Sequence, residues 1–179
     1  MAMRGDRSGW EDDGSDVQRL LSALAAAWRI EDYGVELYIA MSERVRDKEG
    51  SIILRSLAQD EVRHRAWLEK EIDRIFPGRS VRDIEPDPAY GISPSKVFAV
   101  PDEMTPQDEI AGLEAAIEVE KRSVQLYESV AAAADDRELK SLMERLARWE
   151  RGHQRILEDN LHYLRRGGSW YGYTPILDG

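Results

Sequence analysis

Two copies of the motif Glu-x-x-His give this chain a pattern that can bind metal ions. The first copy runs from Glu61 to His64, and the second runs from Glu150 to His153, 89 residues later. Residues three apart lie on the same face of an α-helix, so the glutamate and the histidine of each copy can reach one site. Carboxylate and imidazole groups are ligands for divalent transition metals. The two motifs therefore predict a metal site.

Two lone glutamates extend this pattern. Glu31 and Glu120 are also 89 residues apart, and each stands where the surrounding helical pattern calls for an apolar residue. A buried carboxylate without a partner costs on the order of several kcal/mol, and four together would also repel one another. Two divalent cations would balance the four carboxylates, while one neutral histidine would complete the ligands of each ion. The six side chains therefore predict a pair of metal ions inside the fold.

The ligand types indicate which metals fit and which chemistry follows. Carboxylate-rich ligands with one nitrogen per ion favour iron, and manganese or zinc would also bind. Open coordination positions would let dioxygen or peroxide reach the two ions, so the expected chemistry is redox. No residue beyond the ligands is assigned a catalytic role.

Two further pairs of residues share the offset of 89. Tyr38 and Tyr127 lie on the stripes that carry the lone glutamates, where their hydroxyls either fill the core or hydrogen-bond a ligand carboxylate. Gly34 and Ser123 follow the lone glutamates by three residues. Their small side chains either leave room beside the metals for an oxygen species or allow close helix packing.

Apolar residues at three- and four-residue steps predict two helices in the first half of the chain. The first covers about residues 16–46, and Ser15 with Gln18 forms a capping-box pattern at its start. The second is capped by Asp47 and ends before Pro77. The short connection between them makes these helices antiparallel neighbours.

The second half of the chain repeats this arrangement. A third helix begins with Thr105 as its cap and Pro106 at its first position. A fourth is capped by Asp135 or Asp136 and ends after residue 166. The halves superimpose without a gap over residues 23–69, which predicts a duplicated helix pair. Residues 77–106 hold six of the seven prolines and are expected to form a long crossing segment between the pairs.

These elements resemble the ferritin-like di-iron carboxylate proteins, and rubrerythrin in particular, over about residues 16–165. In rubrerythrin a glutamate seven residues ahead of a tyrosine alternates with Glu-x-x-His, as it does here. The resemblance implies an all-α, ferritin-like antiparallel four-helix bundle with a long crossover between its second and third helices. It also implies the metal ligands, with bridging Glu61 and Glu150, terminal Glu31 and Glu120, and His64 and His153.

The chain departs from classical rubrerythrin in two respects. It has no cysteine and therefore cannot contain the cysteine-ligated rubredoxin domain of that family, so an electron donor must be a separate molecule. Rubrerythrin also carries an extra carboxylate one turn from its third-helix ligand. The corresponding positions here are Ala116, Ile117, Ser123 and Val124.

Composition narrows the class of protein. The net charge of −10 argues against a nucleic-acid binder, and no apolar run approaches the ~20 residues needed to cross a membrane. We expect a cytoplasmic protein with a loose leader over residues 1–14, a bundle over residues 15–166 and a tail over residues 167–179. Trp170, Tyr171 and Tyr173 in the tail are expected to pack on the bundle or on another subunit, which predicts a homodimer or a larger homo-oligomer.

Three functions are compatible with this pattern. The first is a di-iron oxidoreductase that acts on dioxygen, peroxide or Fe(II), as a peroxidase or a ferroxidase. The second is an iron-binding or storage protein without turnover. The third is a helical interaction module that binds no metal.

Overall fold

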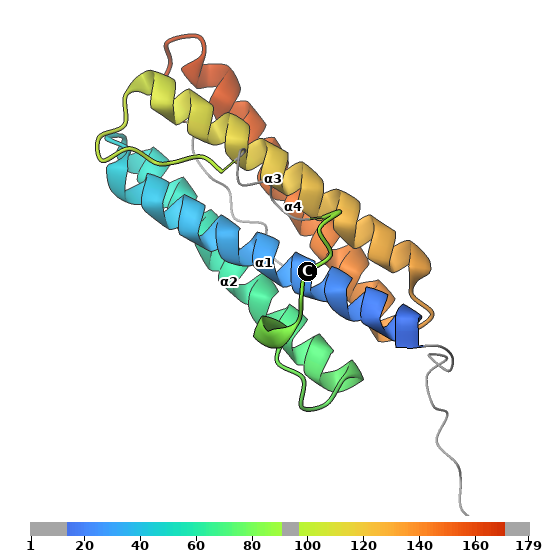
Figure 1. Cartoon of the computed structure of the whole chain (residues 1–179). Coiled ribbons are helices and arrows are strands. Elements are labelled where there is room, and N and C mark those ends of the chain that lie inside the picture. The colour runs from blue at the N-terminus through green and yellow to red at the C-terminus, as the bar shows by residue number, and fades with distance from the viewer. Residues whose placement is uncertain (1–13, 91–96, 171–179) are drawn as a thin grey trace, which may run out of the picture.

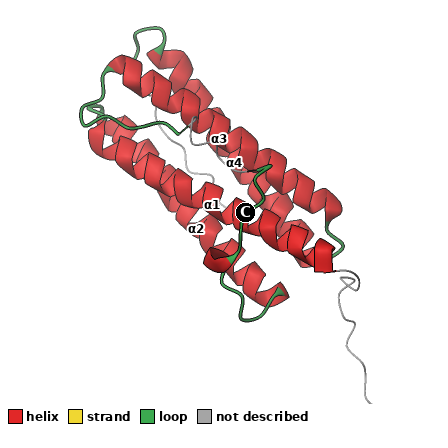
Figure 2. Ribbon diagram, viewed as in Figure 1, coloured by secondary structure: helices red, strands yellow, loops and turns green. Residues whose placement is uncertain are grey.

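The computed structural model describes residues 14–90 and 97–170, and within these ranges the protein is helical with no strand. Figure 1 shows a bundle of four long helices, and Figure 2 shows that loops join them. The helices are α1 (Gly14–Arg44), α2 (Lys48–Ile75), α3 (Pro106–Ala133) and α4 (Arg137–Leu164), with a short 3-10 helix, η1 (Val81–Asp83). The predicted all-α four-helix bundle is confirmed.

Three of the four helices begin where local hydrogen bonding predicts. The side chain of Asp47 caps α2, and that of Asp136 caps α4 by accepting a backbone N–H. Thr105 and Asp108 form a reciprocal capping box at α3, with Pro106 at the first helical position. These side chains satisfy backbone donors that have no partner within the helix, which is why the boundaries could be read from sequence.

The boundaries of α1 and the end of α4 differ from prediction. Helix α1 begins at Gly14, two residues before its predicted start, and the predicted capping box at Ser15 stays a prediction, because that side chain is outside the described part of the chain. It ends at Arg44 instead of residue 46, and Asp47 then caps α2. Helix α4 ends at Leu164, and the turn that follows closes on Gly167 at a φ of 75°.

The core is divided along the bundle axis. Helix α1 packs on α2, α3 packs on α4, and the pairs meet mainly through α1 and α3. One apolar cluster includes Leu24, Leu68 and Leu146, and a second includes Leu57 and Leu157. On each helix the predicted metal ligands fall between the stretches that build these clusters. The polar site therefore lies at mid-bundle with packed apolar side chains above and below it.

The connection between α2 and α3 joins opposite ends of the bundle (Figure 1). Its first part includes η1, where Val81 and Ile84 are buried against the core. Residues 91–96 within the connection lie outside the described ranges. The long crossover over residues 77–106 therefore stays a prediction along that gap.

The predicted leader and most of the predicted tail also lie outside the described ranges, so these domain boundaries stay predictions. Trp170 is described, and it is buried against the bundle. Its indole N–H donates to Glu109 at 2.7 Å, and its ring covers Gly50 so closely that a Cβ there would lie 2.7 Å from it. Among the described helices, none is long and apolar enough to cross a membrane.

Candidate metal centre

All six predicted ligands meet at one place inside the bundle. Helix α1 contributes one residue, α2 two, α3 one and α4 two, and each side chain points into the space between the helices. The exposed fraction of every one of them is between 0 and 3%. The six residues are Glu31, Glu61, His64, Glu120, Glu150 and His153.

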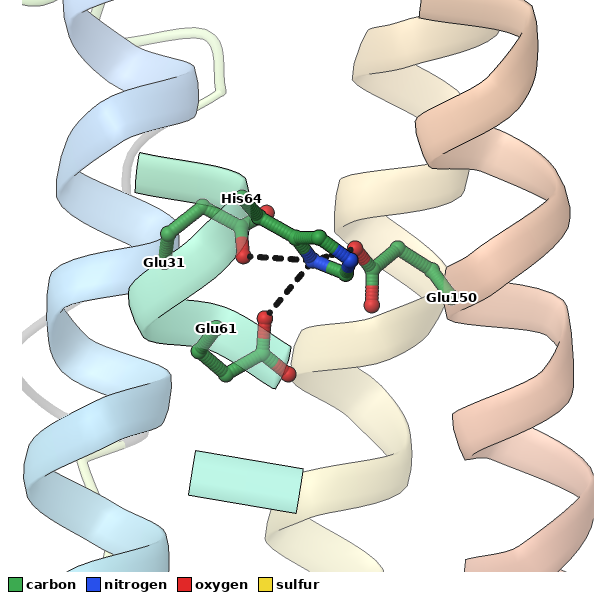
Figure 3. A group of neighbouring side chains, drawn as sticks. All are labelled: Glu31, Glu61, His64 and Glu150. Carbon is green, nitrogen blue, oxygen red and sulfur yellow. Dashed lines mark hydrogen bonds and ion pairs between the residues drawn. The ribbon is translucent and has the colours of Figure 1, made fainter. Parts of the chain in front are cut away.

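The first half of the site surrounds the Nδ1 atom of His64. Glu31 Oε2 and Glu61 Oε2 each lie 3.2 Å from this nitrogen, and Glu150 Oε1 lies 2.8 Å from it. Figure 3 shows these side chains converging from three helices. Their nearest ligand atoms all lie within 4.8 Å of one another, so this half can hold one cation.

The second half surrounds the Nδ1 atom of His153. Glu61 Oε1 lies 3.1 Å from it, Glu150 Oε2 lies 2.9 Å from it, and Glu120 Oε1 lies 3.8 Å from it. These atoms too lie within 4.8 Å of one another. The duplicated sequence has thus produced two half-sites of the same composition.

Glu61 and Glu150 belong to both halves, and we refer to them as the shared glutamates. Each directs one carboxylate oxygen toward His64 and the other toward His153. The two imidazole rings are stacked, with centroids 5.6 Å apart. Two oxygens of one carboxylate can each bind a different ion, so this arrangement suits a pair of ions more than a single one.

Burial and mutual repulsion set the charge of the glutamates when no metal is present. Burial, together with the charge of Glu61, raises the pKa of Glu31 to about 8. Burial and the two shared glutamates raise the pKa of Glu120 well above its ordinary value. Burial and repulsion by neighbouring carboxylates act to raise the pKa of the shared glutamates. A hydrogen bond with Glu31 and contacts with His153 hold the pKa of Glu61 below the ordinary value, and contacts with both histidines do the same for Glu150.

The histidines respond in the opposite sense. Burial alone would lower the pKa of His64 and of His153, but the surrounding carboxylates outweigh burial and raise both pKa values well above the ordinary value. These pKa shifts favour protons on the two histidines, Glu31 and Glu120, and negative charge on the shared glutamates. Positive and negative groups then face one another inside the fold, which lowers the cost of burying them without an ion.

Three buried atoms at the centre form close ion-pair contacts but no hydrogen bond of regular geometry within the described part of the chain. They are both carboxylate oxygens of Glu150 and the Nδ1 atom of His153. Buried polar atoms are normally hydrogen-bonded, and orphaned ones call for an explanation. All three atoms lie in the space shared by the two half-sites. Oxygen and imidazole nitrogen facing a common space form a donor set that fits divalent cations.

Each tyrosine of the repeated pair supports the lone glutamate of the other half. The hydroxyl of Tyr38 on α1 donates a hydrogen bond to Glu120 on α3, and that of Tyr127 on α3 donates to Glu31 on α1. Both tyrosines are fully buried, and burial raises the pKa of each well above the ordinary value. They therefore stay protonated and act as hydrogen-bond donors to the predicted terminal ligands.

Gly34 packs directly against a shared glutamate. A Cβ at this position would lie 3.2 Å from Cγ of Glu61, which is tighter than ordinary contact. Its repeat partner, Ser123, is buried and donates its hydroxyl to the backbone oxygen of Val119 at 3.3 Å. Of the two explanations left open for these small residues, close packing is the one that this geometry favours at Gly34.

Asp60 is a site residue that the sequence reasoning missed. Its side chain is 2% exposed, and its Oδ2 atom lies 3.2 Å from Nε2 of His153. Burial acts to raise the pKa of Asp60, but hydrogen bonds from His153 and from Arg63 lower it. In the sequence, Asp60 stands out only because it directly precedes Glu61. The internal repeat does not point to it, because the equivalent position, 149, holds a tryptophan.

Other acidic residues and a third histidine near the motifs lie outside the cluster. Glu36, Glu114 and Glu118 are exposed on the outer faces of their helices, and His162 is exposed as well. Trp28 and Trp149 are buried, whereas Trp67 is half-buried. The guanidinium of Arg145 covers the ring of Trp67 at 4.3 Å from its centroid.

Comparison with known proteins places this site in a family. The family model of rubrerythrin matches residues 22–161, which span all six clustered residues. The chain belongs to the rubrerythrin family. No protein of curated function matches the sequence of this rubrerythrin-family chain.

Solved structures agree on the fold of this rubrerythrin-family chain. A hypothetical protein from Pyrococcus furiosus is similar at 24% identity and a TM-score of 0.74, over 88% of this chain and 97% of the other. A ferritin-like, diiron-carboxylate protein from Bacillus anthracis is 18% identical with a TM-score of 0.61, over 83% and 99%. A manganese catalase from Anabaena is 17% identical with a TM-score of 0.64, over 100% and 87%. The ferritin-like fold predicted from sequence is thus confirmed.

Proposed function

We propose that this chain binds two divalent metal ions in the buried cluster and uses them as an oxidoreductase. Glu61 and Glu150 would each contribute to holding both ions, and each histidine would hold one of them. Glu31 is a terminal ligand on the His64 side, and the corresponding ligand on the His153 side is Glu120. The single observation that carries this proposal is that the two half-sites share both carboxylates, each with one oxygen toward each histidine.

Iron is the first candidate for both positions. Four carboxylates and two imidazoles suit iron or manganese better than metals that prefer thiolates, and this chain has no cysteine. A diiron-carboxylate protein and a manganese catalase share the fold, which supports these two metals before zinc. Loading the protein with each metal in turn decides among them.

The burial of the cluster limits the substrate to small species such as dioxygen, peroxide or Fe(II). A bound pair of redox-active ions supplies electrons for the reduction of dioxygen or peroxide. The protein excludes bulk water by packing apolar side chains on both sides of the site. The hydroxyls of Tyr38 and Tyr127 hold the terminal carboxylates in place. These 179 residues contain no cysteine and so hold no cysteine-ligated iron centre, and electrons for repeated turnover would come from outside them.

Iron handling without turnover is the second candidate. The positions one turn from Glu120 hold Ala116, Ile117, Ser123 and Val124 instead of the extra carboxylate of classical rubrerythrin, and this favours a simpler function. In this case the protein would take up iron, oxidise it at most once and keep it. Both candidate functions use the same metal pair. They differ in whether a reductant returns the oxidised ions to Fe(II), so that the reaction can repeat.

Anaerobic iron loading followed by an oxidant tests the proposal. The metal-free protein should bind two Fe(II) per chain, and dioxygen or peroxide should then oxidise them, as followed by stopped-flow absorbance. Repeated oxidation on adding a reductant supports the oxidoreductase, and a single oxidation supports iron handling. Glu150→Ala should abolish binding of the pair, because it removes a bridge. Glu158→Ala, an exposed position on the same helix, is the matched control. Far less than one iron per chain in the unmodified protein would refute both candidates.

A further inference from the structure

The two histidines of the site differ in what lies behind them. The Nε2 atom of His153 is 3.2 Å from Asp60 Oδ2, while its Nδ1 atom faces the shared glutamates. This ring can therefore donate its Nε2 proton to Asp60 and, once metal binding displaces the Nδ1 proton, present the lone pair of Nδ1 to the site. The Nε2 atom of His64 is also buried, but it has no hydrogen-bond partner among residues 14–90 and 97–170. One histidine is backed by a carboxylate, and the other is not.

The internal repeat shows where this difference comes from. The offset of 89 residues relates Asp60 to Trp149, so the position that gives His153 a carboxylate gives His64 an indole ring. The ring of Trp149 meets that of His64 edge to face, with centroids 5.7 Å apart. The ring of Trp67 lies 5.5 Å from His64. The duplicated halves are therefore alike in their ligands and unlike in the layer that supports the ligands.

A carboxylate behind a metal-binding histidine has a known physical effect. It accepts the proton of the nitrogen that does not bind metal, fixes the orientation of the ring and makes the other nitrogen a stronger ligand. Removal of such a partner typically weakens metal binding by about 10- to 100-fold. Arg63 forms an ion pair with the other oxygen of Asp60 and keeps that carboxylate in position.

We propose that the two metal positions are unequal and that the one at His153 fills first, because Asp60 supports that histidine alone. The inference rests on the proposed function, in which the cluster binds two ions. The two stepwise dissociation constants should differ by about 10- to 100-fold, the effect expected of one supporting carboxylate. Asp60 is thus a positioning residue, and the ion at His64 is the one that exchanges more readily.

Titration of the full-length, metal-free protein with Co(II), in competition with a chelator, measures the two constants. The lone glutamates identify the positions, because Glu31 contacts only the His64 half and Glu120 only the His153 half. Glu31→Ala should remove the weaker step and keep the tighter one. Glu120→Ala should remove the tighter step. The opposite assignment would overturn the inference.

Substitution of Asp60 tests the cause. Asp60→Asn keeps the shape of the side chain but removes its charge, so it should weaken the tighter step about 10- to 100-fold and leave the weaker step unchanged. Trp149→Asp should strengthen the weaker step by supplying the missing carboxylate. Trp149→Phe, which adds no acceptor, should change neither constant. If Trp149→Asp does not fold, Asp60→Asn alone decides.

A spectroscopic signal separates this role from a general structural one. In the Co(II) protein the Nε2 proton of a bound histidine gives a shifted NMR resonance. At one equivalent of metal this proton should exchange slowly with solvent, and Asp60→Asn should speed its exchange. Equal dissociation constants for the two ions, or constants that Asp60→Asn does not alter, would overturn the inference. The proposal that the cluster binds two ions would still stand. If no Co(II) binds at all, both proposals are refuted.

Discussion

Metal loading of this cluster should release up to about four protons per chain at a pH below the raised pKa values of its ligands, because metal ligands bind in their deprotonated forms. Neighbouring carboxylates, opposed by burial, hold the pKa of His64 and of His153 well above the ordinary value. Burial raises the pKa of Glu31 to about 8 and that of Glu120 well above its ordinary value. Below its raised pKa each of these four groups carries one proton in the metal-free protein, whereas the lowered pKa of each shared glutamate favours its charged form.

The proton count fixes the pH dependence of metal affinity. The binding constant for the pair should rise about 10⁴-fold per pH unit over the range in which all four groups are protonated before loading, or about 100-fold per ion. The dependence weakens as the pH approaches the pKa of Glu31, about 8, because that proton is then already lost. Affinity therefore rises with pH and falls steeply in acid.

Isothermal titration calorimetry counts the protons directly. Titrations with Zn(II) in buffers that share one pH but differ in ionisation enthalpy give the number released from the slope of the observed heat. Glu31→Gln should lower the count by about one, because glutamine has no proton to lose. Glu36→Gln, an exposed position on the same helix, should leave the count unchanged. Release of about one proton or fewer by the unmodified protein would refute the charge assignment.

Four further outcomes follow from the structure. The free energy of unfolding of the metal-free protein in urea should fall as the pH rises above about 6.5, the ordinary pKa of histidine, toward the raised pKa values of His64 and His153. In that range the folded protein binds protons that the unfolded protein has already lost. Stability that stayed flat over that range would contradict this. Gly34→Ala should fold but bind metal more weakly in equilibrium dialysis, because its Cβ would displace Glu61; unchanged affinity would show that the glutamate is not held there. Tyr127→Phe leaves Glu31 without its donor and should cost about 1–3 kcal/mol of unfolding free energy without loss of helicity. Trp170→Ala should cost about 3–5 kcal/mol, and a thermal midpoint that did not fall would place Trp170 outside the core.

The sequence alone determined the elements of the fold and the members of the cluster. Caps at Asp47, Thr105 and Asp136 were readable because they serve backbone groups only a few residues away. The six clustered residues were readable because the repeat places glutamate and histidine on helix faces that otherwise carry apolar side chains. A helical period determines which face of a helix a residue occupies, and burying that face brings the polar residues together.

Only the tertiary structure decided which residues of different helices meet. Tyr38 hydrogen-bonds Glu120 of the other half, although Glu31 lies on its own helix. Asp60 reaches His153 across the bundle, while its repeat partner is the ring of Trp149. Helical periodicity gives the direction of a side chain but not the offset of one helix along its neighbour. That offset is set by the packing of all four helices at once, so contacts between helices depend on the whole fold.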